Sequence, residues 1–448
     1  MLDVFDILLP PFYLLIIYII AYFIYKKNRE TNISYKYFIA GLTAKIIGAV
    51  FLTLIYVFYY NEAGDTINYY STSVAFTNVL LKKDLLAFFE LWLNLGDTYY
   101  TINYFDHTTG FPGFASSDKY AFYVARLLTP ICLLSFKSFI IMSIVTASIS
   151  YIGIWKLYQV FYKEFPHLYK ELAVAILFIP SVVFWGSGLL KDTIAFTSVG
   201  LFVYGFYHFF VLKKYKTQYL LYLLTGTYLI VSIKPYILFA MLPGCIIWLT
   251  NEKLQSVGSK AMKYITGPFL LLLAISLSFV VLSQMSGVLG QYALDNVMDK
   301  AVVTQNDMKQ DYYGGNTFDI GEFDSSVGGV VSKAPLAIIA TLFRPYIWEA
   351  RNPVMILSGL ENTYLLLLTL YLLIKLRFFG FFTLSLKHPL LLFSVLFSLF
   401  FAFSIGISIS NFGSLVRLKI PSLPFFVASL FILKDLHKRS ISTDKPAI

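Results

Sequence analysis

The sequence predicts an all-α fold, a polytopic transmembrane helical bundle of about eleven spans. The chain of 448 residues is 58% hydrophobic and 18% aromatic. Its charged residues amount to only 13%, whereas an ordinary globular domain carries roughly 25%. Apolar runs long enough to cross a hydrocarbon core of about 30 Å also recur along the chain. We therefore expect a single integral membrane domain over residues 1–448.

The apolar runs define the expected spans and two segments that are too short or too interrupted to cross. Tyr120–Phe136 carries Arg126 and Pro130 and is expected to be interfacial or re-entrant, and Ala334–Phe343 is expected to be half-inserted. The expected spans are Leu8–Tyr25, Tyr37–Tyr60, Phe139–Phe161, Leu172–Trp185, Ile194–Leu212, Tyr219–Ile233, Tyr236–Thr250, Ile265–Val288, Met355–Leu376, Leu390–Ser408 and Ile420–Leu433.

The charge of the loops predicts the orientation. Lysines and arginines cluster in short loops such as 26–36 and 213–216, which is typical of cytoplasmic loops. The acid-rich loops 61–119 and 289–334 then lie outside, with the N-terminus outside and the C-terminus in the cytoplasm. In the first loop, Ala75–Leu95 has an apolar stripe and is expected to lie on the bilayer surface as an amphipathic helix. We expect the bacterial cytoplasmic (inner) membrane.

Composition and motifs exclude several classes of function. The net charge of +10 is explained by inner loops and anionic lipid, so no nucleic-acid partner is expected. The five histidines are scattered and the two cysteines lie in apolar runs, so no metal site built on imidazole is expected. No cofactor is certain, and a divalent metal is optional. The phosphate-binding, zinc-protease and nucleophile-elbow motifs of soluble enzymes are absent from the sequence.

Charged residues at the outer ends of spans are the candidate site, because isolated charge there is costly and usually functional. Asp65 follows the span Tyr37–Tyr60, and a carboxylate at this place can act as a general base toward a sugar hydroxyl. Glu62 shares the site or pairs with an arginine. The alternative is an ordinary Asp at the start of a turn or helix.

The segment Pro180–Asp192 interrupts a span with a proline and two glycines. Such a break is tolerated where it lines a cavity or packs against protein. A helix restarting near Leu189 would direct its amides toward a phosphate, with Lys191 adding a charge. The alternative is a proline-kinked helix with a lysine that extends to the interface.

Basic and aromatic residues of the later outer segments complete the candidate site. Guanidinium groups suit phosphate or carboxylate, and aromatic rings stack on sugar faces. The alternatives are interfacial anchoring of the Arg344–Asn352 segment, with Glu349 paired to an arginine, and simple extension of Arg417 to the interface. The candidate substrate-binding residues are Lys191, Lys234, Arg344, Trp348, Glu349, Arg351, Arg417, Tyr69 and Tyr70.

This layout resembles the GT-C class of membrane glycosyltransferases and the related bacterial surface-polysaccharide polymerases. Asp65 matches their acidic position after an early span, and Ala75–Leu95 matches their surface helix. Arg344, Arg351 and Arg417 match the later basic positions that hold a polyprenyl-phosphate sugar. The resemblance implies partners of three kinds: a lipid-linked sugar donor, membrane lipid, and a glycan or protein acceptor.

The expected function is glycosyl transfer on the extracytoplasmic face, from a polyprenyl-phosphate-linked sugar, in cell-surface glycan or glycoprotein assembly. Asp65 would activate the acceptor, and the basic residues would stabilise the phosphate leaving group. Two alternatives stay open. One is a transporter or flippase of lipid-linked saccharides, and the other is a non-catalytic membrane subunit.

Overall fold

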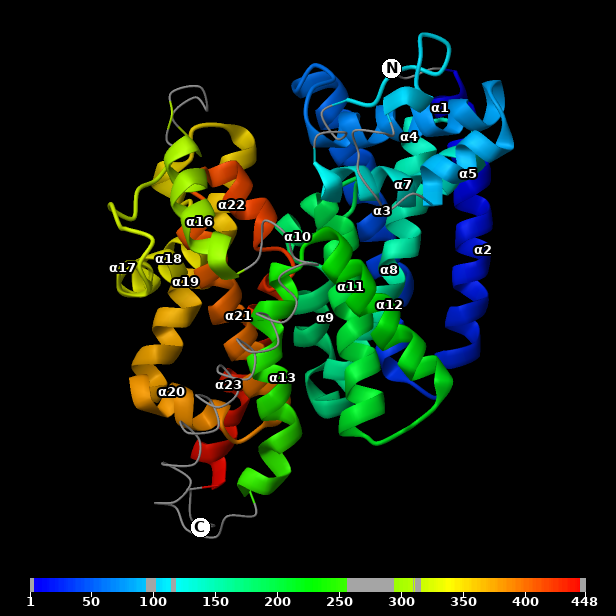
Figure 1. The fold of residues 1–448 in the computed structure, drawn as a ribbon. Helices are drawn as coiled ribbons and strands as arrows, with labels where there is room; N and C mark the ends of the chain where they lie inside the picture. The colour runs from blue at the N-terminus through cyan, green and yellow to red at the C-terminus, as the bar shows by residue number, and fades with distance from the viewer. Residues whose placement is uncertain are drawn as a thin grey trace. The chain divides into compact units, whose positions relative to one another are not determined.

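The computed structural model describes residues 4–93, 102–113, 118–255, 294–308, 310 and 316–443, and these residues are predominantly helical (Figure 1). Within these ranges no strand forms, and the extended backbone makes one isolated antiparallel bridge, between Thr317 and Asn411. The all-α prediction is therefore confirmed for the described chain.

Six helical segments of the described chain are long and apolar enough to cross a membrane. The chain is thus an integral membrane protein by the length and composition of its helices. A seventh candidate is a pair of helices, Phe412–Leu418 and Leu423–Ser440, with a bend of 68° between them. The expected span Ile265–Val288 lies outside the described residues. The six segments are Phe5–Asn28, Ile33–Tyr59, Phe139–Glu164, Lys191–Val211, Pro353–Leu376 and Pro389–Ser408.

The chain divides into two compact units. Unit 1 consists of Met1–Gln159, Val182–Tyr204 and Tyr222–Lys234. Unit 2 consists of Val160–Ser181, Gly205–Leu221 and Pro235–Ile448.

Unit 1 contains the N-terminal helices and the described part of the first acidic loop. Asp6 in α1 accepts hydrogen bonds from the hydroxyl of Ser138 and the amide of Ile140, so it caps the start of α8. The helices are α1 (Phe5–Leu8), α2 (Pro10–Asn28), α3 (Phe38–Leu54), α4 (Asp65–Lys82), α5 (Leu85–Leu93), α7 (Lys119–Leu134), most of α8 (Phe139–Glu164) and α11 (Lys191–Phe206), and parts of α10 (Pro180–Trp185) and α12 (Thr217–Ile233).

Glycines set the close approach of α8, α11 and α12 in unit 1. A Cβ atom on Gly200 of α11 would lie 2.1 Å from the carbonyl oxygen of Gly153 in α8. A Cβ atom on Gly226 of α12 would lie 2.5 Å from the amide nitrogen of Phe202. Small residues allow such backbone contact between membrane helices, and van der Waals packing then holds the helices together.

The expected single amphipathic helix Ala75–Leu95 is wrong in its boundaries, because two helices occupy this stretch. The first, α4, begins ten residues earlier at Asp65 and ends at Lys82, and α5 covers Leu85–Leu93. Between them, the Asp84 carboxylate accepts the amide hydrogen of Ala87 and so starts a new helix. Residues 94 and 95 lie outside the described residues.

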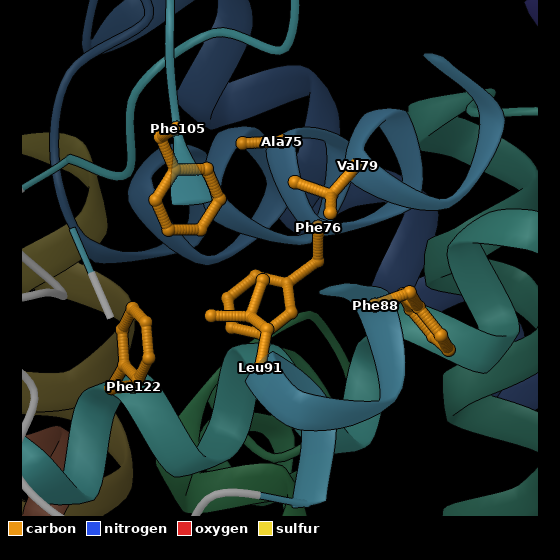
Figure 2. Packing of buried hydrophobic residues seen from close by; sticks show 7 residues of the cluster. All are labelled: Ala75, Phe76, Val79, Phe88, Leu91, Phe105 and Phe122. Carbon is orange, nitrogen blue, oxygen red and sulfur yellow. The ribbon is translucent and has the colours of Figure 1, made fainter. Parts of the chain in front are cut away.

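A small hydrophobic core holds α4, α5 and α7 together (Figure 2). Phe76 of α4 faces Phe122 of α7 with ring centroids 5.1 Å apart, and Phe105 packs against the same ring of Phe76 at 5.6 Å. The described part of the first loop is thus a packed layer of helices. Most of the segment Tyr120–Phe136, expected to be interfacial or re-entrant, belongs to helix α7, which is buried over much of its length and exposed at its C-terminal end. The core residues are Ala75, Phe76, Val79, Phe88, Leu91, Phe105 and Phe122.

The expected span Leu172–Trp185 is not a continuous helix. Helix α9 ends at Leu177 and α10 begins at Pro180, with Phe178 and Ile179 between them. Proline has no amide hydrogen and disfavours helical backbone at the residue before it, which explains the break. The interruption predicted within Pro180–Asp192 is also present, because α10 ends at Trp185 and α11 begins at Lys191. The sequence predicted that the second helix would begin near Leu189.

Unit 2 is built around α21, which packs against α13, α18 and α23. Aromatic rings fill this core, with Phe397 of α21 lying 5.1 Å from Phe425 of α23. The expected half-inserted segment Ala334–Phe343 forms helix α18 with the same boundaries. The helices are α9 (Tyr169–Leu177), α13 (Tyr236–Gln255), α16 (Leu294–Met308), α17 (Val327–Ser332), α18 (Ala334–Phe343), α19 (Pro353–Leu376), α20 (Phe378–Ser385), α21 (Pro389–Ser408), α22 (Phe412–Leu418) and α23 (Leu423–Thr443).

The residues between the expected spans Leu390–Ser408 and Ile420–Leu433 include a short helix, α22. The Asn411 side chain accepts the amide hydrogen of Ser414 and caps the helix at its start.

We predict that Gly200→Leu disrupts the α8–α11 crossing, because the new side chain meets backbone that cannot move aside. The expected loss is on the order of 3 kcal/mol of unfolding free energy, at the upper end for overpacking. Thermal unfolding of the purified chain in detergent measures it. Gly380→Ala is the control, since its nearest atom would be Leu376 Cβ at 3.8 Å. Equal stability of both variants would contradict the proposed packing.

Candidate functional site

Asp65 is the first residue of α4 and follows the candidate span Ile33–Tyr59 after a short turn. The span ends in a π-helical turn, Ile55–Tyr59. Gly64 then has φ of 101°, a left-handed conformation that favours glycine, and lies against the ring of Tyr56. The N-terminus of a helix is a favourable position for an acidic side chain. The helix start is therefore the structural role of Asp65, and its half-buried carboxylate is the candidate base.

Lys191 brings three segments of unit 1 into electrostatic contact. Its ammonium group forms an ion pair with Asp118, the N-cap residue of α7. Both Asp65 and Lys234 lie close enough to Lys191 to act on its charge, the acid attractively and the lysine repulsively. The structure therefore brings together Asp65, Lys191 and Lys234, which were selected from distant parts of the sequence.

Lys234 forms the most deeply buried ion pair of this cluster. Its ammonium group contacts the Asp192 carboxylate, and the two side chains are 5% and 0% exposed. Two charges can share an apolar interior when each neutralises the other at close range. The charge of Lys234 is thus compensated within unit 1. This favours a structural role for Lys234, in which it holds Asp192 and so orders the start of α11.

Lys45 is a buried lysine outside the predicted site residues. It lies near the middle of α3 and is 5% exposed. It donates a hydrogen bond to the carbonyl oxygen of Gly186, the residue after α10. A cation suits the C-terminal end of a helix. Its position inside the apolar run Tyr37–Tyr60 is the sequence feature that would have found it.

The remaining unit 1 candidates differ in exposure. Glu62 is exposed and has positive φ, and its amide donates to the carbonyl oxygen of Tyr56. Tyr69 is 2% exposed within α4. Tyr70 donates its hydroxyl hydrogen to the carbonyl of Lys137, and its ring packs on Phe139 at 4.7 Å. The Tyr69 side chain is thus buried, and the Tyr70 side chain is half-buried with its ring against Phe139.

Arg344 is the centre of a polar and aromatic cluster in unit 2. Its guanidinium group binds the Glu349 carboxylate through two nitrogens, with Nε lying 3.0 Å from Oε1. The same group lies over the rings of Phe318 and Phe412, with centroids at 5.0 and 5.3 Å. A cation is stabilised over aromatic faces. The structure therefore brings the second acidic loop and the start of α22 together around Arg344.

The other unit 2 candidates lie near this cluster in sequence. Trp348 is 71% exposed and stacks on Tyr346 with centroids 4.8 Å apart, so its outer face is open to a ligand. Arg351 is exposed and Arg417 of α22 is half-buried. Glu349 pairs with an arginine, Arg344, which is one part of the interfacial alternative for this segment.

A buried polar network continues from Arg344 to the bend between α22 and α23. Asn362 donates to the backbone carbonyls of Arg344 and Pro345, and Lys419 donates to the Asn362 side chain at 2.6 Å. Lys419 and Asn362 are each 1% exposed. Glu361, one residue away, accepts from the hydroxyl of Ser181 at 2.6 Å. Hydrogen bonds of this kind offset the free energy of burying charge.

Neither a metal-binding group nor a similar known protein was found for this chain within the described residues and the comparisons made. Among the described residues, no group of three or more His, Cys, Asp or Glu side chains is arranged to hold a metal ion. Comparison of the chain with protein-family models, curated proteins and solved structures found no match.

We predict that Lys234→Met destabilises unit 1, because it leaves the Asp192 carboxylate buried without its partner. The expected loss is about 3–5 kcal/mol of unfolding free energy. The double variant Lys234→Met, Asp192→Leu should recover most of that loss, since both charges are gone. Denaturant unfolding in mixed detergent measures all three proteins.

The matched control is Lys83→Met, which breaks the more exposed ion pair with Asp106. An exposed pair contributes about 0–1 kcal/mol. A loss from Lys234→Met no larger than that of the control would show that the buried pair does not hold the helices.

Proposed function

We propose that the chain transfers a glycosyl group from a polyprenyl-phosphate-linked sugar to a glycan or protein acceptor on the extracytoplasmic face. This reaction would serve cell-surface glycan or glycoprotein assembly. The observation that carries the proposal is the position of Asp65, directly after a candidate span and within electrostatic range of the Lys191–Asp118 pair. A carboxylate beside cations at a membrane exit provides a base and a site for a phosphate in one place.

In the proposed reaction, the Asp65 carboxylate removes the proton from the acceptor hydroxyl. The acceptor oxygen forms a bond to the anomeric carbon of the donor sugar, on the face opposite the phosphate. The bond between that carbon and the phosphate oxygen breaks, and its electron pair leaves with the polyprenyl phosphate. Inversion at the anomeric carbon follows from this single displacement. Because phosphate is a good leaving group, a divalent metal is optional.

In this proposal, the chain crosses a bacterial inner membrane about eleven times. The N-terminus and the acidic loops 61–119 and 289–334 are outside, and the C-terminus is cytoplasmic. The six or seven helices that are long and apolar enough support the membrane assignment. The shorter apolar helices Thr217–Ile233, Tyr236–Thr250 and Ala334–Phe343 are candidates for further crossings.

In unit 2, the residues proposed to bind the donor are Arg344, Arg351 and Arg417, with Trp348 as a surface for a sugar ring. The exposed ring of Trp348 supports this role. The Arg344–Glu349 pair supports a guanidinium group held in a fixed orientation, which suits planar recognition of an anion. In this proposal, a phosphate of the donor takes the place of the Glu349 carboxylate on the Arg344 guanidinium group.

We predict that Asp65→Asn lowers glycosyl transfer by about 100-fold or more, because the amide cannot accept the proton. The assay uses the purified full chain with polyprenyl-phosphate sugars and measures transfer to added acceptor. Arg344→Ala should lower transfer as well. The control is Asp84→Asn, since an amide still caps α5 and should leave transfer unchanged. Full activity of the Asp65 and Arg344 variants would refute the proposal.

A transporter or flippase of lipid-linked saccharides is the second candidate. The 68° bend between α22 and α23, with buried Lys419 and nearby Glu361, favours it. Broken helices with buried charge at the break are typical of substrate and ion sites in secondary transporters. The two functions separate in sealed vesicles. Transport moves labelled donor across the bilayer without new glycosidic bonds, whereas a transferase forms them.

A further inference from the structure

Arg126 is a buried cation to which the sequence assigned no role. It lies on α7 and is 6% exposed. Its Nε and Nη2 atoms are buried, and among the described residues neither has a hydrogen-bond partner. Three other buried or half-buried cations of unit 1, namely Lys45, Lys191 and Lys234, each have a polar partner. Lys234 has Asp192, Lys191 has Asp118, and Lys45 has the Gly186 carbonyl.

The surroundings of Arg126 fix its position. The indole of Trp92 donates to the Arg126 carbonyl at 2.9 Å, and the Ser73 hydroxyl donates to the Ala125 carbonyl at 3.1 Å. The guanidinium carbon lies 4.9 Å from the ring centroid of Phe122. Phe122 belongs to the core that holds α4, α5 and α7 together (Figure 2). The side chain therefore extends from a packed helix rather than from a loop that could turn it toward water.

The guanidinium group is charged under physiological conditions. Burial lowers the pKa of Arg126 to about 10, with a smaller opposing influence from Tyr123. At neutral pH the group therefore remains protonated. A buried charge without a counter-charge is strongly unfavourable, so a group of opposite charge is required to offset it.

The location of Arg126 connects it to the candidate site of unit 1. Residues Asp118, Phe122 and Arg126 are spaced by four along α7 and so lie on one helix face. Asp118 is the partner of Lys191, which lies within electrostatic range of Asp65. Eight residues of α-helix correspond to a rise of about 12 Å. Arg126 is therefore about two turns along α7 from the charged cluster, within the same unit.

We propose that Arg126 binds the phosphate group of a lipid-linked substrate, and that this anion supplies a counter-charge that no described residue provides. The planar guanidinium with its unused Nε and Nη2 atoms suits two parallel hydrogen bonds to phosphate oxygens. This inference rests on the proposed function, which requires a lipid-borne phosphate. It adds that unit 1 carries a phosphate-binding residue of its own, about two turns along α7 from Asp118.

The test measures thermal unfolding of the purified full chain in detergent, with and without polyprenyl phosphate. Ligand that binds only the folded chain raises its unfolding temperature. We expect this rise in the unmodified chain and its loss in Arg126→Met. Arg126→Lys should keep a smaller rise, because it retains the charge but not the planar fork.

The stability of the variant without ligand is the sharper measurement. If the guanidinium lacks a counter-charge in the free chain, Arg126→Met removes an unfavourable charge and unfolds at the same or a higher temperature. A lower unfolding temperature without ligand would show that a group of the chain itself compensates Arg126, and would overturn the inference. An undiminished response of Arg126→Met to polyprenyl phosphate would do the same.

Two added ligands distinguish the source of the phosphate. Inorganic phosphate and a phosphatidic acid with two acyl chains are compared with polyprenyl phosphate at equal concentration. The inference expects the largest Arg126-dependent rise with polyprenyl phosphate. An equal rise with inorganic phosphate, or with phosphatidic acid, would overturn the assignment to a polyprenyl-linked substrate. Arg439→Met is the matched control and should keep the full rise, since Arg439 forms a surface pair with Asp435.

Failure of this inference and failure of the proposed function give different results. Asp65→Asn should keep the rise with polyprenyl phosphate even where transfer is lost. An Arg126-dependent rise in a chain that never forms glycosidic bonds would refute the transferase while supporting the phosphate site. Transfer that is unaffected in Arg126→Met would overturn the phosphate site while leaving the transferase in place.

Discussion

The need to compensate buried charge is the constraint on which the rest of this structure depends. In an apolar helical protein, each charged group away from water requires an opposite charge or hydrogen bonds. Unit 1 meets this requirement with the Lys234–Asp192 and Lys191–Asp118 pairs, which connect the starts of α7 and α11 to the end of α12. Unit 2 meets it with Asn362, which connects Lys419 to the backbone of Arg344 and Pro345. These contacts determine where helix ends lie.

Much of the fold could be predicted from the sequence because apolar runs are a local property. Helix α18 has the boundaries expected from its run, and α13 begins at the expected Tyr236. The errors occurred where a single side chain changes the backbone. Asp84 caps a new helix, and Pro180 ends the span expected over Leu172–Trp185. The periodicity of apolar residues does not show whether a charged residue such as Asp84 interrupts one helix or caps the start of the next.

The candidate site was less predictable, because its partners are distant in sequence. Position at the outer ends of runs identified Lys191, Lys234 and Arg344, but it could not show that each has a carboxylate partner. Lys234 and Asp192 are 42 residues apart, and only folding brings them together. Arg126 was visible in the sequence only as an irregularity in a short apolar segment. Its importance depends on burial and on the lack of a partner among the described residues, both of which are tertiary properties.

The π-helical turn Ile55–Tyr59 has an evolutionary consequence. Its hydrogen bond from the Tyr60 amide to the Ile55 carbonyl encloses one residue more than an α-helical turn would. In a homologous chain, deletion of one residue here would restore an ordinary α-helix and leave the span intact. The acid corresponding to Asp65 would then follow the span one position earlier.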